Sequence, residues 1–207
     1  KRPAVVVTPS NAKYNWADQI KEHTYMKCQV LSGRVPYPIT ESIVIINYDI
    51  LTFKKKKGEK KKDWLSELIK IKPYVIVPDE SHYLKTRTAQ RTKACLKLSR
   101  KAKCFIPMSG TPIINRPIEL FNAIKLINPN LFPNYWEYAK RYCNAIHTGF
   151  GWNMKGASHM EELHSILSRS IMIRRKKSEV LKDLPEKVRS FVPMEIINRS
   201  EYTAASY

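Results

Sequence analysis

A short apolar run in the middle of the chain leads directly into two carboxylates and a histidine. Residues 75–82 read VIVPDESH, so Asp79, Glu80 and His82 follow the run almost at once. Such a run fits a buried strand of a parallel sheet, and ligands bind beyond the carboxyl ends of such strands. Adjacent carboxylates there suit two tasks, holding a hydrated magnesium ion on nucleotide phosphates and activating a water molecule. The alternative for so short a motif is a strand followed by a solvated acidic turn.

A second apolar run, residues 103–108, ends in the small polar turn Ser109-Gly110-Thr111. The two segments together resemble the helicase superfamily 2 ATPases. In that superfamily DESH is the Walker B motif, of the DEAD/DEAH-box type, and SGT belongs to the motif that couples hydrolysis to nucleic-acid binding. The pair is far more specific than either motif alone.

Four further segments narrow this resemblance. TPIINRPIEL at 111–120 and RRKKSEVLKDLP at 174–185 are similar to the Snf2 family. YAKRYCN at 138–144 and KGASHMEELH at 155–164 are similar to its annealing-helicase, HARP-like branch.

The resemblance implies a three-layer α/β fold with a mostly parallel central sheet. Residues 1–185 would form the first RecA-like lobe of a P-loop NTPase, and residues 186–207 would begin the connection to a second RecA-like lobe. The phosphate-gripping GxxxxGK[ST] loop of such enzymes is missing, because none of the six glycines is followed by lysine. In the family that loop precedes the strand at Ala4, so we expect an excised piece that has no ATPase activity alone.

The resemblance also implies ATP and Mg²⁺ as cofactors and gives roles to the motif residues. Asp79 would hold Mg²⁺ through water, and Glu80 would polarise the attacking water. His82 and the 109–111 turn would link that site to bound DNA.

Five residues fall on family motifs that contact DNA, namely Thr8, Pro9, Ser10, Asn47 and Tyr48. Backbone amides and hydroxyls at a helix start can bind phosphates without reading sequence. The family more often has Ser-Tyr where this chain has Asn47-Tyr48. Ser10 could instead cap its own helix, and Tyr48 could belong to the edge of the core.

The charge of the chain points to a polyanionic partner. The formal net charge is +19 and the isoelectric point is about 9.8, which favours nucleic acid, here duplex or branched DNA. The alternative is a lysine-rich solvated surface, and residues 54–62 alone contribute seven lysines.

Cysteine usage and hydropathy indicate the compartment. Cys28, Cys95, Cys104 and Cys143 are far apart and form no CxxC pair, so we expect buried free thiols rather than zinc ligands or disulfides. The chain has no apolar run near the ~20 residues that span a bilayer and no secretory leader. We expect no membrane partner and an intracellular protein of the cytoplasm, nucleoid or nucleus.

The spacing of apolar residues, together with cap residues, glycine and proline, predicts the secondary-structure elements. Strands are expected at 4–8, 27–31, 43–48, 75–77 and before the 109–111 turn. Helices are expected at 11–22, 63–70, 86–100, 117–127 and from 158 onward. Ser10 or Asn11, Asp63 and Ser158 are the expected caps, and residues 149–156 are expected to form a loop. Because proline has no amide donor, the strand at 75 is expected to end at Val77.

The motifs and the charge favour part of an ATP-dependent double-stranded DNA translocase of Snf2 type. The resemblance to the annealing-helicase branch implies that it acts in DNA annealing or fork remodelling. One alternative is another superfamily 2 motor, acting on RNA or serving a restriction system. The other is a non-catalytic basic DNA-binding module that keeps a motor fold.

Overall fold

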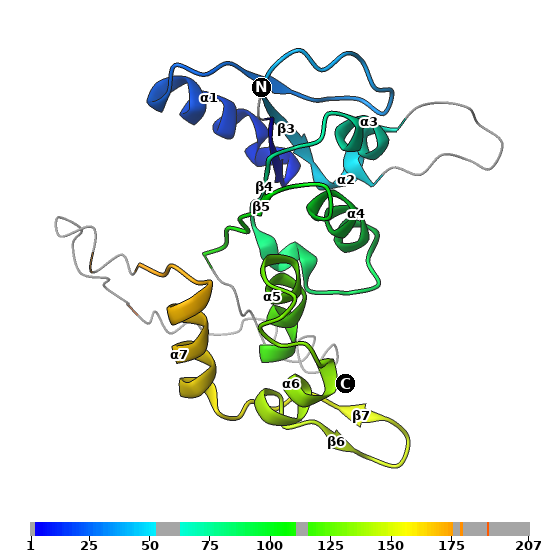
Figure 1. Cartoon of the computed structure of the whole chain (residues 1–207), viewed down its shortest axis with the longest axis vertical. Coiled ribbons are helices and arrows are strands. Elements are labelled where there is room, and N and C mark those ends of the chain that lie inside the picture. The colour runs from blue at the N-terminus through cyan, green and yellow to red at the C-terminus, as the bar shows by residue number, and fades with distance from the viewer. Residues whose placement is uncertain (1–2, 53–62, 111–115, 176–178, 180–189, 191–207) are drawn as a thin grey trace, which may run out of the picture. The chain divides into compact units, whose positions relative to one another are not determined.

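The computed structural model describes residues 3–52, 63–110, 116–175, 179 and 190 of the chain. The lysine run at 54–62, Thr111 and the end of the 174–185 segment lie outside these residues. The chain divides into two compact units, Lys1–Met172 and Ile173–Tyr207. All the described helices and strands with stated bounds belong to the first unit (Figure 1).

A five-stranded sheet with every pairing parallel organises this unit. The strands are β1 (Ala4–Thr8), β2 (Cys28–Val30), β3 (Ile43–Asn47), β4 (Val75–Pro78) and β5 (Cys104–Phe105). Their order across the sheet is β2-β3-β1-β4-β5, so the strands are joined by crossovers. The sheet confirms the predicted three-layer α/β lobe, with α1 on one side and α3 and α4 on the other (Figure 1).

Helices and short 3-10 turns connect the strands and continue beyond the sheet. Those around the sheet are η1 (Ser10–Ala12), α1 (Lys13–His23), α2 (Tyr48–Leu51), α3 (Trp64–Lys70), η2 (Ser81–Leu84) and α4 (Gln90–Ser99). Those that follow are η3 (Pro117–Leu120), α5 (Phe121–Ile127), α6 (Tyr135–Tyr142) and α7 (Met160–Ser170). Between α6 and α7 the strands β6 (Ile146–His147) and β7 (Trp152–Asn153) pair as an antiparallel hairpin, where the sequence predicted only a loop.

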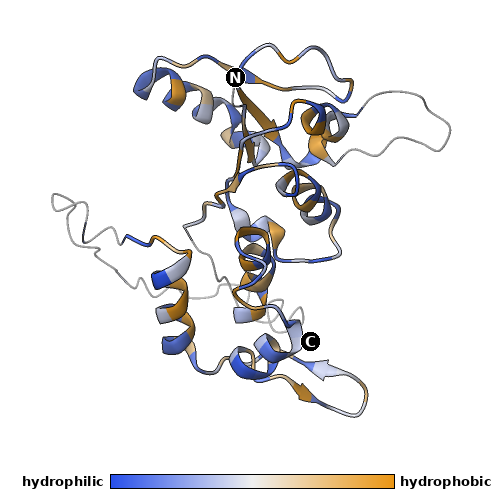
Figure 2. Cartoon of the chain, viewed as in Figure 1, coloured by the Kyte–Doolittle hydropathy of each residue, from blue (hydrophilic) through white to orange (hydrophobic). Residues whose placement is uncertain are grey.

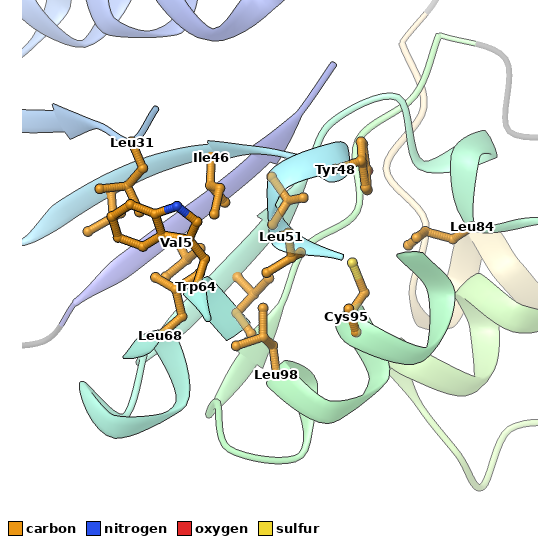
Figure 3. Close-up of a cluster of buried hydrophobic side chains, with 14 of the residues drawn as sticks. Val5, Leu31, Ile46, Tyr48, Leu51, Trp64, Leu68, Leu84, Cys95 and Leu98 are labelled. Atoms are coloured by element: carbon orange, nitrogen blue, oxygen red, sulfur yellow. The ribbon is translucent and has the colours of Figure 1, made fainter. Parts of the chain in front are cut away.

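The main hydrophobic core lies between the sheet and helices α3 and α4 (Figure 3). Alternate residues of a strand face opposite sides, so Val5 and Ile46 enter this core and Ile45 is buried on the side of α1. Figure 2 shows the central strands of the five-stranded sheet as apolar and α1 as mixed, as expected for buried parallel strands covered by amphipathic helices. Trp64 anchors α3 here, and its indole donates to the Gly33 carbonyl at 2.9 Å.

A second apolar cluster joins α5, α6 and α7. It contains Phe121, Ile124, Tyr138, Tyr142, Cys143, Leu163 and Leu167. The Tyr138 hydroxyl donates to the Pro117 carbonyl at 2.8 Å, which satisfies the polar end of a buried ring. In the aromatic segment 131–142, Tyr138 and Tyr142 are buried, whereas Trp136 remains 41% exposed.

Two predicted helix caps and one strand end are wrong. At the start of α1 no side chain makes a cap bond, and the Ser158 hydroxyl donates to the Arg141 carbonyl instead of capping α7. Strand β4 includes Pro78, because a proline keeps its carbonyl and that oxygen accepts from Met108 N at 2.8 Å. The Asp63 cap is confirmed, since its carboxylate accepts from Ser66 N at 2.8 Å.

All four cysteines are free thiols. Cys95 and Cys143 are buried and burial raises the pKa of the Cys95 thiol to about 12, whereas Cys104 is exposed, contrary to the expectation of burial. Among the described residues, no helix combines the length and hydropathy that crossing a bilayer requires.

The core predicts a sharp difference between two leucines of α4. Leu98 is fully buried and Leu96 is 37% exposed, so Leu98→Ala should lower the free energy of unfolding by about 2–5 kcal/mol. Leu96→Ala changes helix propensity in the same way and is the matched control. Urea denaturation of the two variants measures the difference, and equal losses would contradict the assignment of the core.

Candidate nucleotide-hydrolysis site

Three polar side chains meet at the carboxyl edge of the sheet. Thr8 ends β1 and pairs in register with Asn47, which ends β3. Asp79 follows β4 directly, and its amide donates to the Val7 carbonyl at 2.8 Å. Because these strands are parallel and adjacent, their ends bring residues distant in sequence to one place.

The carboxylate of Asp79 is held by three donors from three parts of the chain. Its Oδ2 accepts from Thr8 Oγ1 at 3.0 Å and from Trp16 Nε1 at 2.8 Å. Its Oδ1 accepts from the amide of Glu80 at 2.9 Å. The donors are neutral, so they orient the carboxylate without supplying an opposite charge.

This donor set fits a hydrated magnesium ion. An ionised carboxylate offers about four acceptor sites, so the three hydrogen bonds leave capacity for a metal-bound water. Mg²⁺ is usually held by one or two carboxylates together with waters and substrate phosphates. Among the residues that the structure describes, no three His, Cys, Asp or Glu side chains gather as a metal cluster.

Glu80 occupies a strained position beside this carboxylate. Its φ of 48° and ψ of 54° lie in the left-handed region, which a residue with a Cβ adopts at a cost of about 1–3 kcal/mol. Its neighbours fix the conformation, because Tyr48 Oη donates to the Asp79 carbonyl at 2.7 Å and Tyr83 N donates to the Glu80 carbonyl at 2.9 Å. The Glu80 side chain is 44% exposed, so its carboxylate is accessible from solvent.

His82 lies next to Glu80. Its Nδ1 is 3.1 Å from Glu80 Oε2, a close contact that lacks the alignment of a hydrogen bond. Its ring is also 5.0 Å from that of Tyr83. The structure therefore brings the three residues of the predicted catalytic group, Asp79, Glu80 and His82, into one loop.

The predicted coupling turn lies beside the same loop. Met108 N donates to the Pro78 carbonyl and Ser81 N donates to the Met108 carbonyl, each at 2.8 Å. These bonds place Ser109 and Gly110 next to the DESH segment. Thr111 belongs to the part of the chain that is not described.

A stack of three side chains packs against the loop that contains Asp79 and Glu80. The rings of Tyr48 and Tyr83 are 5.3 Å apart and nearly parallel, at 8°. The Arg91 guanidinium lies 5.1 Å from the Tyr83 ring centroid, and its Nε donates to the Tyr83 carbonyl at 2.7 Å. Burial raises the pKa of Tyr48 well above its ordinary value, so its hydroxyl stays protonated and remains a donor.

The five residues predicted to contact DNA differ in exposure. Ser10 is exposed and Pro9 is half-buried, whereas Thr8, Asn47 and Tyr48 are buried at 0%, 5% and 3% exposure. The buried hydroxyls of Thr8 and Tyr48 face Asp79, as described above. DNA contact at this edge stays a prediction, and Ser10 is the residue best exposed to make it.

Sequence reasoning missed Trp16, Tyr83 and Arg91. Trp16 was assigned only to its helix, and the single available signal was that a partly buried indole needs a hydrogen-bond acceptor. Which acceptor it finds depends on how α1 packs on the sheet. Arg91 lies in the helix predicted at 86–100, and no signal in the sequence indicates that its Nε donates to the Tyr83 carbonyl.

The Tyr48 hydroxyl offers a test of this loop. Tyr48→Phe should lower the free energy of unfolding by about 0.5–1.5 kcal/mol, because the Asp79 carbonyl loses its donor and the ring is kept. Tyr25→Phe, at a fully exposed ring, is the matched control and should be neutral. Urea denaturation checks both, and a neutral Tyr48→Phe would show that the hydrogen bond does not hold the loop.

Comparisons with known proteins agree with this geometry. The family model described as an SNF2-related domain matches residues 1–205. The mouse protein "DNA annealing helicase and endonuclease ZRANB3" is 36% identical over 208 residues, which cover 94% of this chain and 18% of that protein. The Caenorhabditis elegans homolog of "SWI/SNF-related matrix-associated actin-dependent regulator of chromatin subfamily A-like protein 1" is 37% identical over 197 residues, covering 92% of this chain and 27% of that protein.

A solved structure shows the same fold. The Sulfolobus solfataricus SWI2/SNF2 ATPase core in complex with dsDNA has a TM-score of 0.65 and 25% identity, and the match covers 88% of this chain and 36% of that one. This chain therefore spans only a minor part of each of these proteins. The match of a family model to nearly the whole chain shows that the chain belongs to the SNF2-related domain family.

Proposed function

We propose that this chain is the first RecA-like lobe of an ATP-dependent double-stranded DNA translocase that remodels or anneals DNA. The observation that carries the proposal is the Asp79 carboxylate, fixed by Thr8, Trp16 and Glu80 at the carboxyl edge of the sheet with an exposed Glu80 beside it. Membership of the SNF2-related domain family and the names of the relatives support DNA as the partner.

The residues of the site have distinct roles in the proposed reaction. Asp79 would hold Mg²⁺ through water, and bound Mg²⁺ would neutralise charge on the β- and γ-phosphates of ATP. Glu80 would orient the attacking water and accept its proton. Coupling between ATP hydrolysis at this site and DNA binding would depend on His82, Ser109, Gly110 and Thr111.

The proposal extends to the surroundings of the lobe. Residues 1–185 would belong to the lobe, and residues 186–207 would begin the connection to a second RecA-like lobe. The turn at Pro9 and Ser10 contacts the DNA backbone, and the net charge of +19 strengthens that contact. A DNA partner places the protein in the nucleus or nucleoid.

The deciding experiment is Glu80→Gln in the full-length protein. The amide keeps the shape of the side chain but cannot accept a proton, so DNA-stimulated ATP hydrolysis should fall by about 10²- to 10⁴-fold while ATP binding is retained. Glu22→Gln, at an exposed residue of α1, is the control and should hydrolyse ATP normally. Retention of most of the activity in Glu80→Gln would exclude Glu80 as the base, and a wild-type protein without hydrolysis would favour the non-catalytic module.

We expect Trp16 to affect ATP hydrolysis through its hydrogen bond to Asp79. Trp16→Phe keeps an aromatic ring and removes the 2.8 Å donor to Oδ2, a hydrogen bond to a charged group worth about 1.5–3 kcal/mol. We expect a loss of about tenfold or more in kcat and a higher Mg²⁺ concentration for half-maximal hydrolysis. Tyr14→Phe on the same helix, where the ring is 64% exposed, is the control. An unchanged Mg²⁺ dependence in Trp16→Phe would mean that the indole does not position Asp79.

A further inference from the structure

The hairpin between α6 and α7 displays an aromatic residue at its tip. Phe150 lies between Gly149 and Gly151 and its side chain is fully exposed, at 106%. Gly149 has a φ of 87°, which a residue with a Cβ rarely adopts. The turn is closed by the Thr148 amide and hydroxyl, which both donate to the Gly151 carbonyl, at 2.8 and 2.9 Å.

Further aromatic rings line the hairpin below the tip. The rings of Trp136 and Trp152 are 4.8 Å apart, and His147 lies 5.3 Å from Trp152. Both indoles remain about two-fifths exposed, at 41% and 43%. The Lys140 ammonium lies 5.9 Å from the centroid of the Trp152 ring, so a cation accompanies the aromatic surface.

The hairpin and the segment after it contact α6, and α6 packs in the second apolar cluster. Ser158 N donates to the Tyr142 carbonyl at 3.0 Å, and Tyr135 Oη contacts Met154 Sδ at 3.3 Å. Gly156 packs so closely that a Cβ there would lie 2.8 Å from Asn144 Cβ. These contacts hold the hairpin, whose two strands lie between α6 and α7 in the chain (Figure 1), against α6.

Two lysines beside the exposed aromatic rings favour an anionic partner over a cationic one. Residues 136–160 include Lys140, Arg141, Lys155 and two histidines, against one acidic residue, Glu137, and Glu161 and Glu162 follow in the first turn of α7. Arg141 is already paired with Glu162, and this bond lowers the pKa of that carboxyl to about 2. Among the described residues, Lys140 and Lys155 have no such carboxylate partner and are available to phosphates.

We propose that this hairpin binds unpaired bases of DNA, with Phe150 and the Trp136–Trp152 pair as stacking surfaces and Lys140 and Lys155 near the backbone. Aromatic faces beside cations are the combination by which proteins hold single-stranded nucleic acid without reading its sequence. The choice of DNA as the nucleic acid rests on the proposed function. The hairpin would thus engage the single-stranded part of a branched substrate, separately from the duplex contact at Ser10.

The test compares forked DNA with blunt duplex DNA in the full-length protein. Each stacked base contributes about 5- to 150-fold in affinity, so Phe150→Ala should weaken binding to forked DNA by that factor and affect blunt duplex far less. 2-Aminopurine placed in the unpaired arm should be quenched by the wild-type protein and not by Phe150→Ala. Phe150→Trp keeps a stacking ring and should restore both signals.

Tyr25→Ala is the matched control, because Tyr25 is an equally exposed aromatic residue outside the hairpin. It should bind forked DNA like the wild type. Thermal unfolding of Phe150→Ala checks that the tip makes no contribution to folding.

Three results would overturn the inference. The first is equal loss of forked and blunt duplex binding in Phe150→Ala, and the second is tighter binding of unpaired RNA than of unpaired DNA. The third is unchanged fork binding in Phe150→Ala, and a lowered thermal midpoint in that variant would then mean that Phe150 packs on protein. Duplex-stimulated ATP hydrolysis by the wild type tests the proposed function separately, since its absence would leave a Phe150-dependent fork contact intact.

Discussion

The geometry of the site depends on one hydrogen-bonded carboxylate. Asp79 accepts bonds from a hydroxyl at the end of β1, an indole on α1 and the amide that follows it in the loop. The strand register and the packing of α1 must both be correct for these donors to meet. Ser10 in η1 and Trp16 in α1 belong to consecutive elements, so a shift of this segment would move a donor of the carboxylate.

The fold and the place of Asp79 at the edge of the sheet could be predicted because their signals are local. The runs at Ala4–Thr8 and Ile43–Asn47 are apolar and mostly β-branched, and both form buried parallel strands. Asp79 could be placed because the end of a parallel strand is fixed by the end of its apolar run. The family resemblance then assigned chemical roles that composition alone does not give.

The errors came from partners that are distant in sequence. Trp16 and Asp79 are 63 residues apart, so no local pattern identifies their bond. Ser158 has the sequence of a helix cap, but the Arg141 carbonyl is the acceptor that its hydroxyl meets after folding. The aromatic segment shows the same limit, since Tyr138 and Trp136 look alike in sequence and only the packing of α6 separates the buried ring from the exposed one.

At Glu80 the left-handed backbone lowers the stability of the fold, whereas the proposed reaction needs the carboxylate of this residue. Glycine or asparagine adopts this conformation more easily, so either replacement would relieve strain of about 1 kcal/mol or more while removing the carboxylate. Laboratory selection for heat resistance alone would therefore favour losing the proposed base at this position. At this position folding and the proposed chemistry therefore favour different residues.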